Sequence, residues 1–129
     1  MATVINNSNI KNFVDLYVAG KKEQLPEDLQ NKLIGEWDVS EVTNMSRLFM
    51  NATNFNEPLN SWDVSQTTDM SHMFHNAKSF NQLLNDWDVS RVTNMSYMFY
   101  NAISLNQPFD KWLSSKVRRS MAFMFHIDE

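Results

Sequence analysis

Two rhythms of hydrophobic residues alternate along the middle of the chain, and both return every 25 residues. The first rhythm is an apolar residue, a Trp three positions later and a Val two positions after the Trp, as in Ile34, Trp37 and Val39. Residues two apart point to the same face of an extended chain, so this rhythm predicts a short strand in each unit. Its spacing is that of a leucine-rich repeat with Trp in the middle position. The residues that set the register are Trp37, Trp62, Trp87 and Trp112.

The second rhythm has the spacing of a helix. Met45, Leu48, Phe49 and Ala52 stand at positions i, i+3, i+4 and i+7, which form one face of a helix of about two turns. The same pattern returns in the next two units. Because so short a helix is stable only when its apolar face is packed, we expect it to cover the layer of strands.

A fixed period of this length is typical of stacked repeats, in which each unit buries its apolar face against its neighbours. We therefore predict an α/β fold for residues 34–129. It would be a leucine-rich-repeat-like, right-handed solenoid with short parallel strands on one face and short helices on the other. The array would contain three full repeats and a degenerate, partial C-terminal repeat.

Residues 1–33 lack the repeat and predict a helical N-terminal cap over the open end of the core. An apolar stripe that includes Ile10, Val14 and Tyr17 indicates a first helix, with Ser8 or Asn7 as its N-cap. Gly20 would end this helix, and a second helix would begin near Pro26.

The composition is that of a folded domain without a marked electrostatic target. The 129 residues are 43% hydrophobic, which excludes a generally disordered chain. The net charge of −4 offers no basic face for nucleic acid. Without cysteine there is no disulfide, thiolate nucleophile or thiolate metal site. No apolar stretch is long enough to span a membrane and the N-terminus does not read as a signal peptide, so the expected location is the cytoplasm.

Motifs for catalysis are scarce. The chain has only Gly20 and Gly35, so it contains neither a glycine-rich phosphate loop nor a nucleophile elbow. His72 and His75 lie three residues apart, but nothing marks a third ligand, and zinc sites need three or four. We therefore expect no enzymatic activity, no metal site and no cofactor.

One set of carboxylates still needs an explanation. Asp38, Asp63 and Asp88 each follow a Trp and would point outward from the concave face of the predicted sheet, stacked ~5 Å apart. Their mutual repulsion requires an offset, by hydrogen bonds from nearby Ser residues or turn amides, by a raised pKa or by a bound cation. Three interpretations stay open: a turn residue that each unit needs, a calcium site, and the carboxylate pair of a retaining glycosidase.

Positions that change from unit to unit are better binding candidates, because framework residues repeat for packing. A second column on the predicted concave face runs from acidic to basic: Glu41, Gln66, Arg91 and Lys116. Two rows on the predicted helix faces become more aromatic towards the C-terminus: Arg47, His72, Tyr97 and Phe123, and beside them Met50, His75, Tyr100 and His126. Aromatic residues are enriched in protein interfaces, although neutral variation on a solvated face would produce the same change.

The repeated WDVSxVTNMSxMFxNAxxFNxPLNxW pattern over residues 34–125 resembles the repeat of BspA-like proteins, a divergent leucine-rich-repeat group. The resemblance implies a leucine-rich-repeat-like solenoid, which many members use for adhesion or other protein binding at cell surfaces. It implies no catalysis.

The expected function is that of a non-catalytic protein–protein interaction module that presents a rigid repeat surface. The sequence does not identify its protein partner. The alternative is a structural repeat protein that assembles with copies of itself into a homo-oligomer. A third interpretation is a cation-binding or carbohydrate-active solenoid that uses the column of Asp38, Asp63 and Asp88.

Overall fold

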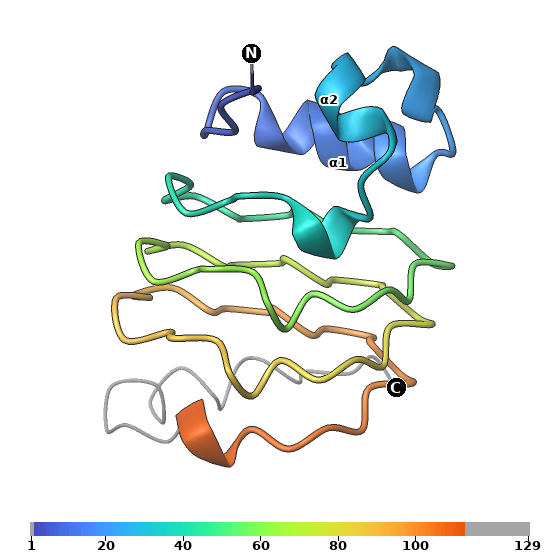
Figure 1. The fold of residues 1–129 in the computed structure, drawn as a ribbon. Helices are drawn as coiled ribbons and strands as arrows, with labels where there is room; N and C mark the ends of the chain where they lie inside the picture. The colour runs from blue at the N-terminus through green and yellow to red at the C-terminus, as the bar shows by residue number, and fades with distance from the viewer. Residues whose placement is uncertain (1, 113–129) are drawn as a thin grey trace.

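The computed structural model describes residues 2–112, and in it the chain forms a stack with two helices at one end (Figure 1). The helices are α1 (Ile10–Val18) and α2 (Glu27–Gln30). The described residues also contain three single 3₁₀ turns: η1 (Lys22–Gln24), η2 (Ile34–Glu36) and η3 (Asp110–Trp112). Between η2 and η3 the chain runs in irregular layers that lie side by side (Figure 1). We name them layer 1 (residues 34–58), layer 2 (59–83) and layer 3 (84–108).

The N-terminal segment packs through the stripe that its spacing predicts. Ile10, Val14 and Tyr17 of α1 are buried, and Gly20 follows the helix with a φ of 75°, a conformation that glycine adopts without strain. The predicted N-cap is wrong, because Asn9 occupies that position and its side chain makes no capping hydrogen bond to the helix.

Asn7 instead closes the open edge of layer 1. Its Oδ1 accepts hydrogen bonds from the backbone N–H groups of Thr43 (2.9 Å) and Asn44 (3.2 Å). In the next layer the backbone N–H of Thr68 bonds to the carbonyl oxygen of Thr43 (2.8 Å). The amide of Asn7 therefore supplies the acceptor that a preceding layer would have provided.

The predicted solenoid of parallel strands and short helices is wrong. Residues 2–112 contain no β-strand and no sheet, and the only strand-like pairing among them is two isolated parallel bridges, Asn44 with Asp69 and Asp69 with Asn94. These bridges lie in the Thr-Asn-Met segment and its equivalents, not in the Trp-x-Val segment that was expected to pair. After Trp37 the chain turns, because the N–H of Val42 donates to the carbonyl of Val39 (3.0 Å) and the side chain of Asp38 accepts a hydrogen bond from the backbone N–H of Ser40 (3.0 Å). The same turn follows Trp62 and Trp87.

Three Trp side chains, those of Trp62, Trp87 and Trp112, form hydrogen bonds between layers where the backbone pairing of strands was expected. The indole Nε1–H donates to a main-chain carbonyl of the preceding layer: Trp62 to Ile34 (2.8 Å), Trp87 to Leu59 (2.9 Å) and Trp112 to Leu84 (3.0 Å). Neighbouring layers are thus joined at these segments through side chains, so no backbone ladder forms there.

In the three layers the predicted short helices are also absent, and consecutive turns replace them. The N–H of Leu48 bonds to the carbonyl of Met45 (3.3 Å), and that of Ala52 to the carbonyl of Phe49 (3.1 Å). The third residue of each turn has a positive φ, 60° at Arg47 and 63° at Asn51, as in type II turns and unlike a helix.

The reason for the turns lies in the neighbouring layer. Alternate N–H groups point across to it: Met45 to Asp69 (2.8 Å), Arg47 to Ser71 (2.9 Å), Phe49 to Met73 (2.8 Å) and Asn51 to His75 (2.7 Å). Layer 2 bonds to layer 3 in the same way. In a helix these N–H groups would bond to carbonyls of the same segment, whereas the turns leave every second N–H group available to bond to the neighbouring layer.

The core is a continuous stack of apolar side chains from all layers. Phe49, Phe74 and Phe99 stack with centroid separations of 5.3 and 5.6 Å, and Phe55 stacks on Phe80 at 6.0 Å. The apolar positions of both rhythms are buried in layers 1 and 2. The core was therefore predicted correctly, even though the backbone around it was not.

Candidate functional site

The three repeated carboxylates are turn residues of the framework. Oδ1 of Asp63 accepts hydrogen bonds from the backbone N–H (3.0 Å) and the hydroxyl (2.6 Å) of Ser65. These bonds hold the pKa of Asp63 below its usual range, although the charges of Asp38 and Asp88 act in the opposite direction. The pKa values of Asp38 and Asp88 are lowered in the same way by Ser40 and Ser90. Hydrogen bonds therefore offset the repulsion, which is the first of the three explanations that the sequence left open, and the pKa values are lowered, not raised.

Nor do these carboxylates belong to a metal-binding cluster. Within residues 2–112, no group of three or more His, Cys, Asp or Glu side chains is arranged to hold a metal ion. The charged forms of all three Asp residues are stabilised by similar neighbours, whereas a glycosidase needs two carboxylates in different environments.

The second predicted column is exposed and partly connected. Glu41, Gln66 and Arg91 are all solvent-exposed. Arg91 Nη1 in layer 3 donates to Gln66 Oε1 in layer 2 at 2.7 Å. Within the part of the chain that the structure describes, no sheet lies beneath them, so the prediction of a concave sheet face is wrong there. Lys116 lies outside the described residues.

The two predicted rows do come together, but on turns and not on helices. His72 and His75 in layer 2 meet Tyr97 and Tyr100 in layer 3. Ring centroids are 5.3 Å apart for His72 and Tyr97 and 4.5 Å apart for His75 and Tyr100. The two Tyr rings meet edge to face at 5.8 Å. We call these four side chains the ring cluster. Phe123 and His126 lie outside the described residues.

The backbone conformation at the ring cluster is unusual. His72 and Tyr97 each have a φ of 55°, and the equivalent Arg47 in layer 1 has a φ of 60°. Left-handed backbone costs roughly 1–2 kcal/mol for residues that are not glycine. The bonds between layers hold it in place, since the N–H of His72 donates to the carbonyl of Ser96 (3.0 Å). Hydrogen bonds to the adjacent layer thus fix the backbone that carries the ring cluster.

The two histidines of the cluster form a close pair. Their Nδ1 atoms lie 2.9 Å apart, so one ring donates a proton and the other accepts it. Burial lowers the pKa of His72, the charge of Arg47 lowers it further, and that of Asp69 acts in the opposite direction. The neutral form of the His72 imidazole is therefore favoured.

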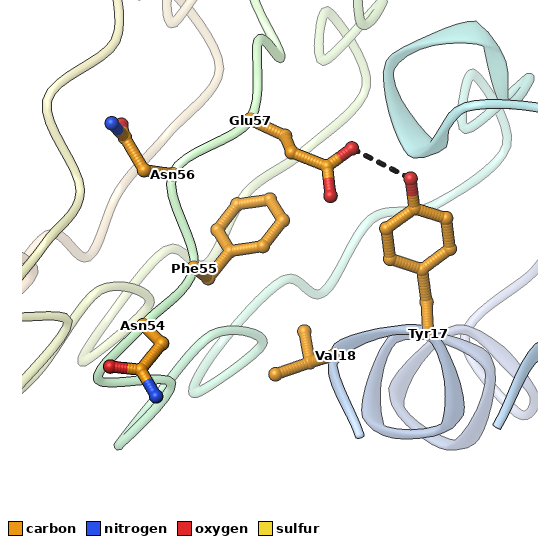
Figure 2. A pocket seen from close by; sticks show the side chains of 6 residues that line it. All are labelled: Tyr17, Val18, Asn54, Phe55, Asn56 and Glu57. Atoms are coloured by element: carbon orange, nitrogen blue, oxygen red, sulfur yellow. Dashed lines mark hydrogen bonds between the residues drawn. The ribbon is translucent and has the colours of Figure 1, made fainter. Parts of the chain in front are cut away.

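A separate hollow lies where α1 meets layer 1 (Figure 2). This pocket of about 250 Å³ is lined by Tyr17, Val18, Asn54, Phe55, Asn56 and Glu57. The Tyr17 hydroxyl donates to Glu57 Oε1 at 2.6 Å, as the dashed line in Figure 2 shows. Burial and this bond raise the pKa of Tyr17 to about 12. The contact fastens the N-terminal segment to the stack.

Sequence reasoning missed Glu57, although the repeat contained a signal. Glu57 aligns with Gln82 and Gln107 in the following layers. Each Gln donates its side-chain amide to the Asn Oδ1 of the preceding layer, at 3.1 and 2.9 Å. Layer 1 has no preceding layer with such an Asn. At the equivalent position it has Glu57, whose carboxylate accepts from the Tyr17 hydroxyl.

Comparison with known proteins places the chain in one family. A family model described as "Mycoplasma protein of unknown function, DUF285" matches residues 14–129. The resemblance to BspA-like leucine-rich-repeat proteins is therefore wrong as an assignment of family. No curated protein and no solved structure matches the chain. Among the described residues, no helix has the length and apolar character needed to cross a membrane.

Proposed function

The chain belongs to DUF285, a family of Mycoplasma proteins of unknown function, and we propose that it is a non-catalytic protein-recognition module. The surface that we assign to recognition is the ring cluster of His72, His75, Tyr97 and Tyr100. One observation carries the proposal: four aromatic rings from two layers lie in mutual contact at positions that the framework leaves free to vary.

The freedom to vary follows from the repeat. Equivalent positions hold Arg47, His72 and Tyr97 on nearly the same backbone, with φ values of 60°, 55° and 55°. The backbone hydrogen bonds there involve main-chain atoms only, so they are the same whichever side chain is present. The choice of side chain at these positions therefore leaves the backbone bonds unchanged, and the side chains can be selected for contact with a partner.

The chemistry of the cluster is that of an interface anchor. Tyr and Arg are enriched at the centres of protein interfaces, where large rings bury much area at little cost in conformational entropy. Tyr97 is 39% exposed and can still lose surface to a partner. Because the backbone is fixed by bonds on both sides of layer 2, little ordering is needed on binding.

The experiment introduces a photo-crosslinking amino acid at Tyr97 and, as a matched control, at Ile103 in the same layer, which is 67% exposed. Crosslinking in an extract of the source organism is followed by mass spectrometry, and the captured protein is purified. The dissociation constant of the complex is then measured for Tyr97→Ala and for Ile103→Ala.

We expect a defined adduct from position 97 and at least a tenfold weaker complex for Tyr97→Ala, as for an interface anchor. Ile103→Ala should bind like the unchanged chain. Equal adducts from both positions, or equal affinities for both variants, would refute the proposal. An adduct of the chain with itself would favour self-assembly over recognition of another protein.

A further inference from the structure

We propose that the boundary between the N-terminal segment and layer 1 is a groove that binds an extended, basic peptide segment of a partner protein. The inference is independent of the ring cluster, because it depends only on residues of the N-terminal segment and of layer 1 and on the start of layer 2. Its starting point is a series of three hollows that follow one another along this boundary.

The three hollows are continuous with one another. The first, of about 220 Å³, lies between the C-terminal end of α1 and residues 48–52 of layer 1. The second is the pocket of about 250 Å³ that Figure 2 shows. The third, of about 210 Å³, lies beside η2. Val18 lines both the first and the second hollow, and Glu57 lines both the second and the third. Their order along layer 1 suits an extended chain better than a compact ligand.

The backbone of layer 1 offers a row of hydrogen-bond acceptors at the first hollow. In layer 2, four alternate carbonyls accept N–H groups of layer 1 at 2.7–2.9 Å: those of Asp69, Ser71, Met73 and His75. The equivalent carbonyls of layer 1 are those of Asn44, Ser46, Leu48 and Met50. Because the layers repeat the same backbone, these carbonyls are directed to the side on which α1 lies.

This row can pair with an added chain. Within residues 2–112, no backbone N–H group bonds to any of its four carbonyls. Leu48 and Met50, which carry two of them, line the first hollow. An extended peptide presents alternate N–H groups on one side, so it can bond to the row as an added strand bonds to the edge of a sheet.

The charge of the groove selects a basic peptide. Three carboxylates line the hollows, those of Asp15, Glu36 and Glu57, and among the described residues no Lys, Arg or His lines them. Asp15 is paired with Lys11 at 2.8 Å, with both side chains about half exposed. Glu36 and Glu57 form no ion pair with any residue that the structure describes. These two carboxylates therefore favour a Lys or Arg side chain in the groove.

Apolar side chains lie between the carboxylates. Val18 is 37% exposed and Leu33, in the third hollow, is 59% exposed, so both can lose surface to a ligand. Figure 2 shows Val18 of α1 facing Phe55 of layer 1 across the second hollow. Successive side chains of an extended peptide point to opposite sides. The expected ligand is therefore a segment in which apolar and basic residues alternate.

The experiment titrates the full chain into a fluorescein-labelled peptide of about ten residues in which Lys and Val alternate, with fluorescence anisotropy as the readout. A peptide with Glu in place of Lys tests the charge. Two further peptides carry N-methyl groups on the Lys or on the Val residues, so each lacks one alternate set of N–H groups.

We expect a saturable one-to-one complex with the Lys–Val peptide that weakens with added salt. One of the two N-methylated peptides should bind at least tenfold more weakly, because it lacks the N–H groups that face the carbonyl row. Equal affinity for the Lys–Val and Glu–Val peptides, or for all the Lys–Val peptides with and without N-methyl groups, would overturn the proposal.

Variants of the chain locate the site. Val18→Arg should weaken binding at least tenfold, because it adds bulk and positive charge where two hollows meet. Its matched control is Ile103→Arg, at an exposed position of layer 3. Glu57→Gln keeps an acceptor for the Tyr17 hydroxyl and should weaken binding by about threefold, whereas Glu41→Gln, an exposed carboxylate outside the groove, should not. Equal losses in a groove variant and its control would contradict the assignment.

A second measurement uses the unchanged chain and so does not depend on how the variants fold. In a ¹H–¹⁵N spectrum, the Lys–Val peptide should shift the signals of Val18, Gly35 and Glu57 first. Shifts centred on the ring cluster would overturn the proposal. A dimer in light scattering that Val18→Arg or the peptide dissociates would assign the groove to a second copy of the chain, and would overturn it too.

Discussion

The indole hydrogen bond between layers can be tested by comparing two buried tryptophans, one with this bond and one without it. Trp62 and Trp37 are both 3% exposed. Trp62 Nε1 donates to the carbonyl of Ile34 at 2.8 Å, whereas Trp37 Nε1 is buried without a partner among the described residues. Replacement of each by Phe keeps a ring in place and removes the N–H group.

The expected losses follow from three contributions. A Phe in place of Trp leaves unfilled volume that costs about 1–2 kcal/mol at either position. Trp62→Phe also loses a hydrogen bond worth about 1 kcal/mol net, since the Ile34 carbonyl keeps its bond from the backbone N–H of Trp37 (3.1 Å). Trp37→Phe removes an unpaired buried donor, which stabilises the folded chain by about 1–3 kcal/mol and offsets the loss of packing. We therefore expect a loss of about 2–3 kcal/mol for Trp62→Phe and close to zero for Trp37→Phe.

The assay is urea denaturation followed by far-ultraviolet circular dichroism, because tryptophan fluorescence changes with the substitution itself. The unfolding free energies are comparable if the three m-values agree. Equal losses for the two variants would refute the idea that the indole N–H joins the layers. A larger loss for Trp37→Phe would show that its N–H has a partner.

Three further predictions concern the framework. Tyr17 should ionise near pH 10 in the unfolded chain and at about 12 in the folded one. The free energy of unfolding should therefore fall by about 2–3 kcal/mol as the pH rises across this range. Tyr17→Phe should remove that part of the fall. Parallel plots of unfolding free energy against pH for the variant and the unchanged chain would contradict the prediction. Ser65 lowers the pKa of Asp63, so the charged form adds stability above pH 3.8 that is lost on acidification. In chemical denaturation, the unfolding free energy of Asp63→Asn should therefore lie below that of the unchanged chain at pH 7, and the difference should shrink as the pH falls to 3. Gly35→Ala would place a Cβ 2.5 Å from the carbonyl oxygen of Pro58 and should cost about 1–3 kcal/mol in the same assay, whereas a neutral result would exclude this close approach.

The candidate site could be predicted in part. The repeat period aligned His72 with Tyr97 and His75 with Tyr100, and the structure places both pairs in ring contact. The 2.9 Å contact between the two histidines could not be predicted, because it depends on a turn that was expected to be a helix. Glu57 was missed because its partner, Tyr17, lies in a segment without the repeat.

The sequence by itself determined the layering and the core. Identical apolar residues every 25 positions can all be buried only if the units stack in register, and Trp62, Met70 and Phe74 are buried as that argument requires. The same apolar spacing is compatible with a helix or with a chain of turns, since both can bring those side chains to one face.

Only the tertiary structure decided between helix and turns. The choice depends on where each backbone N–H finds its acceptor, and the acceptor for Phe49 is the carbonyl of Met73 in the next layer (2.8 Å). The hydrophobicity of a side chain can be read from the sequence, because it is the same before and after folding. A hydrogen bond between layers exists only after the layers have come together.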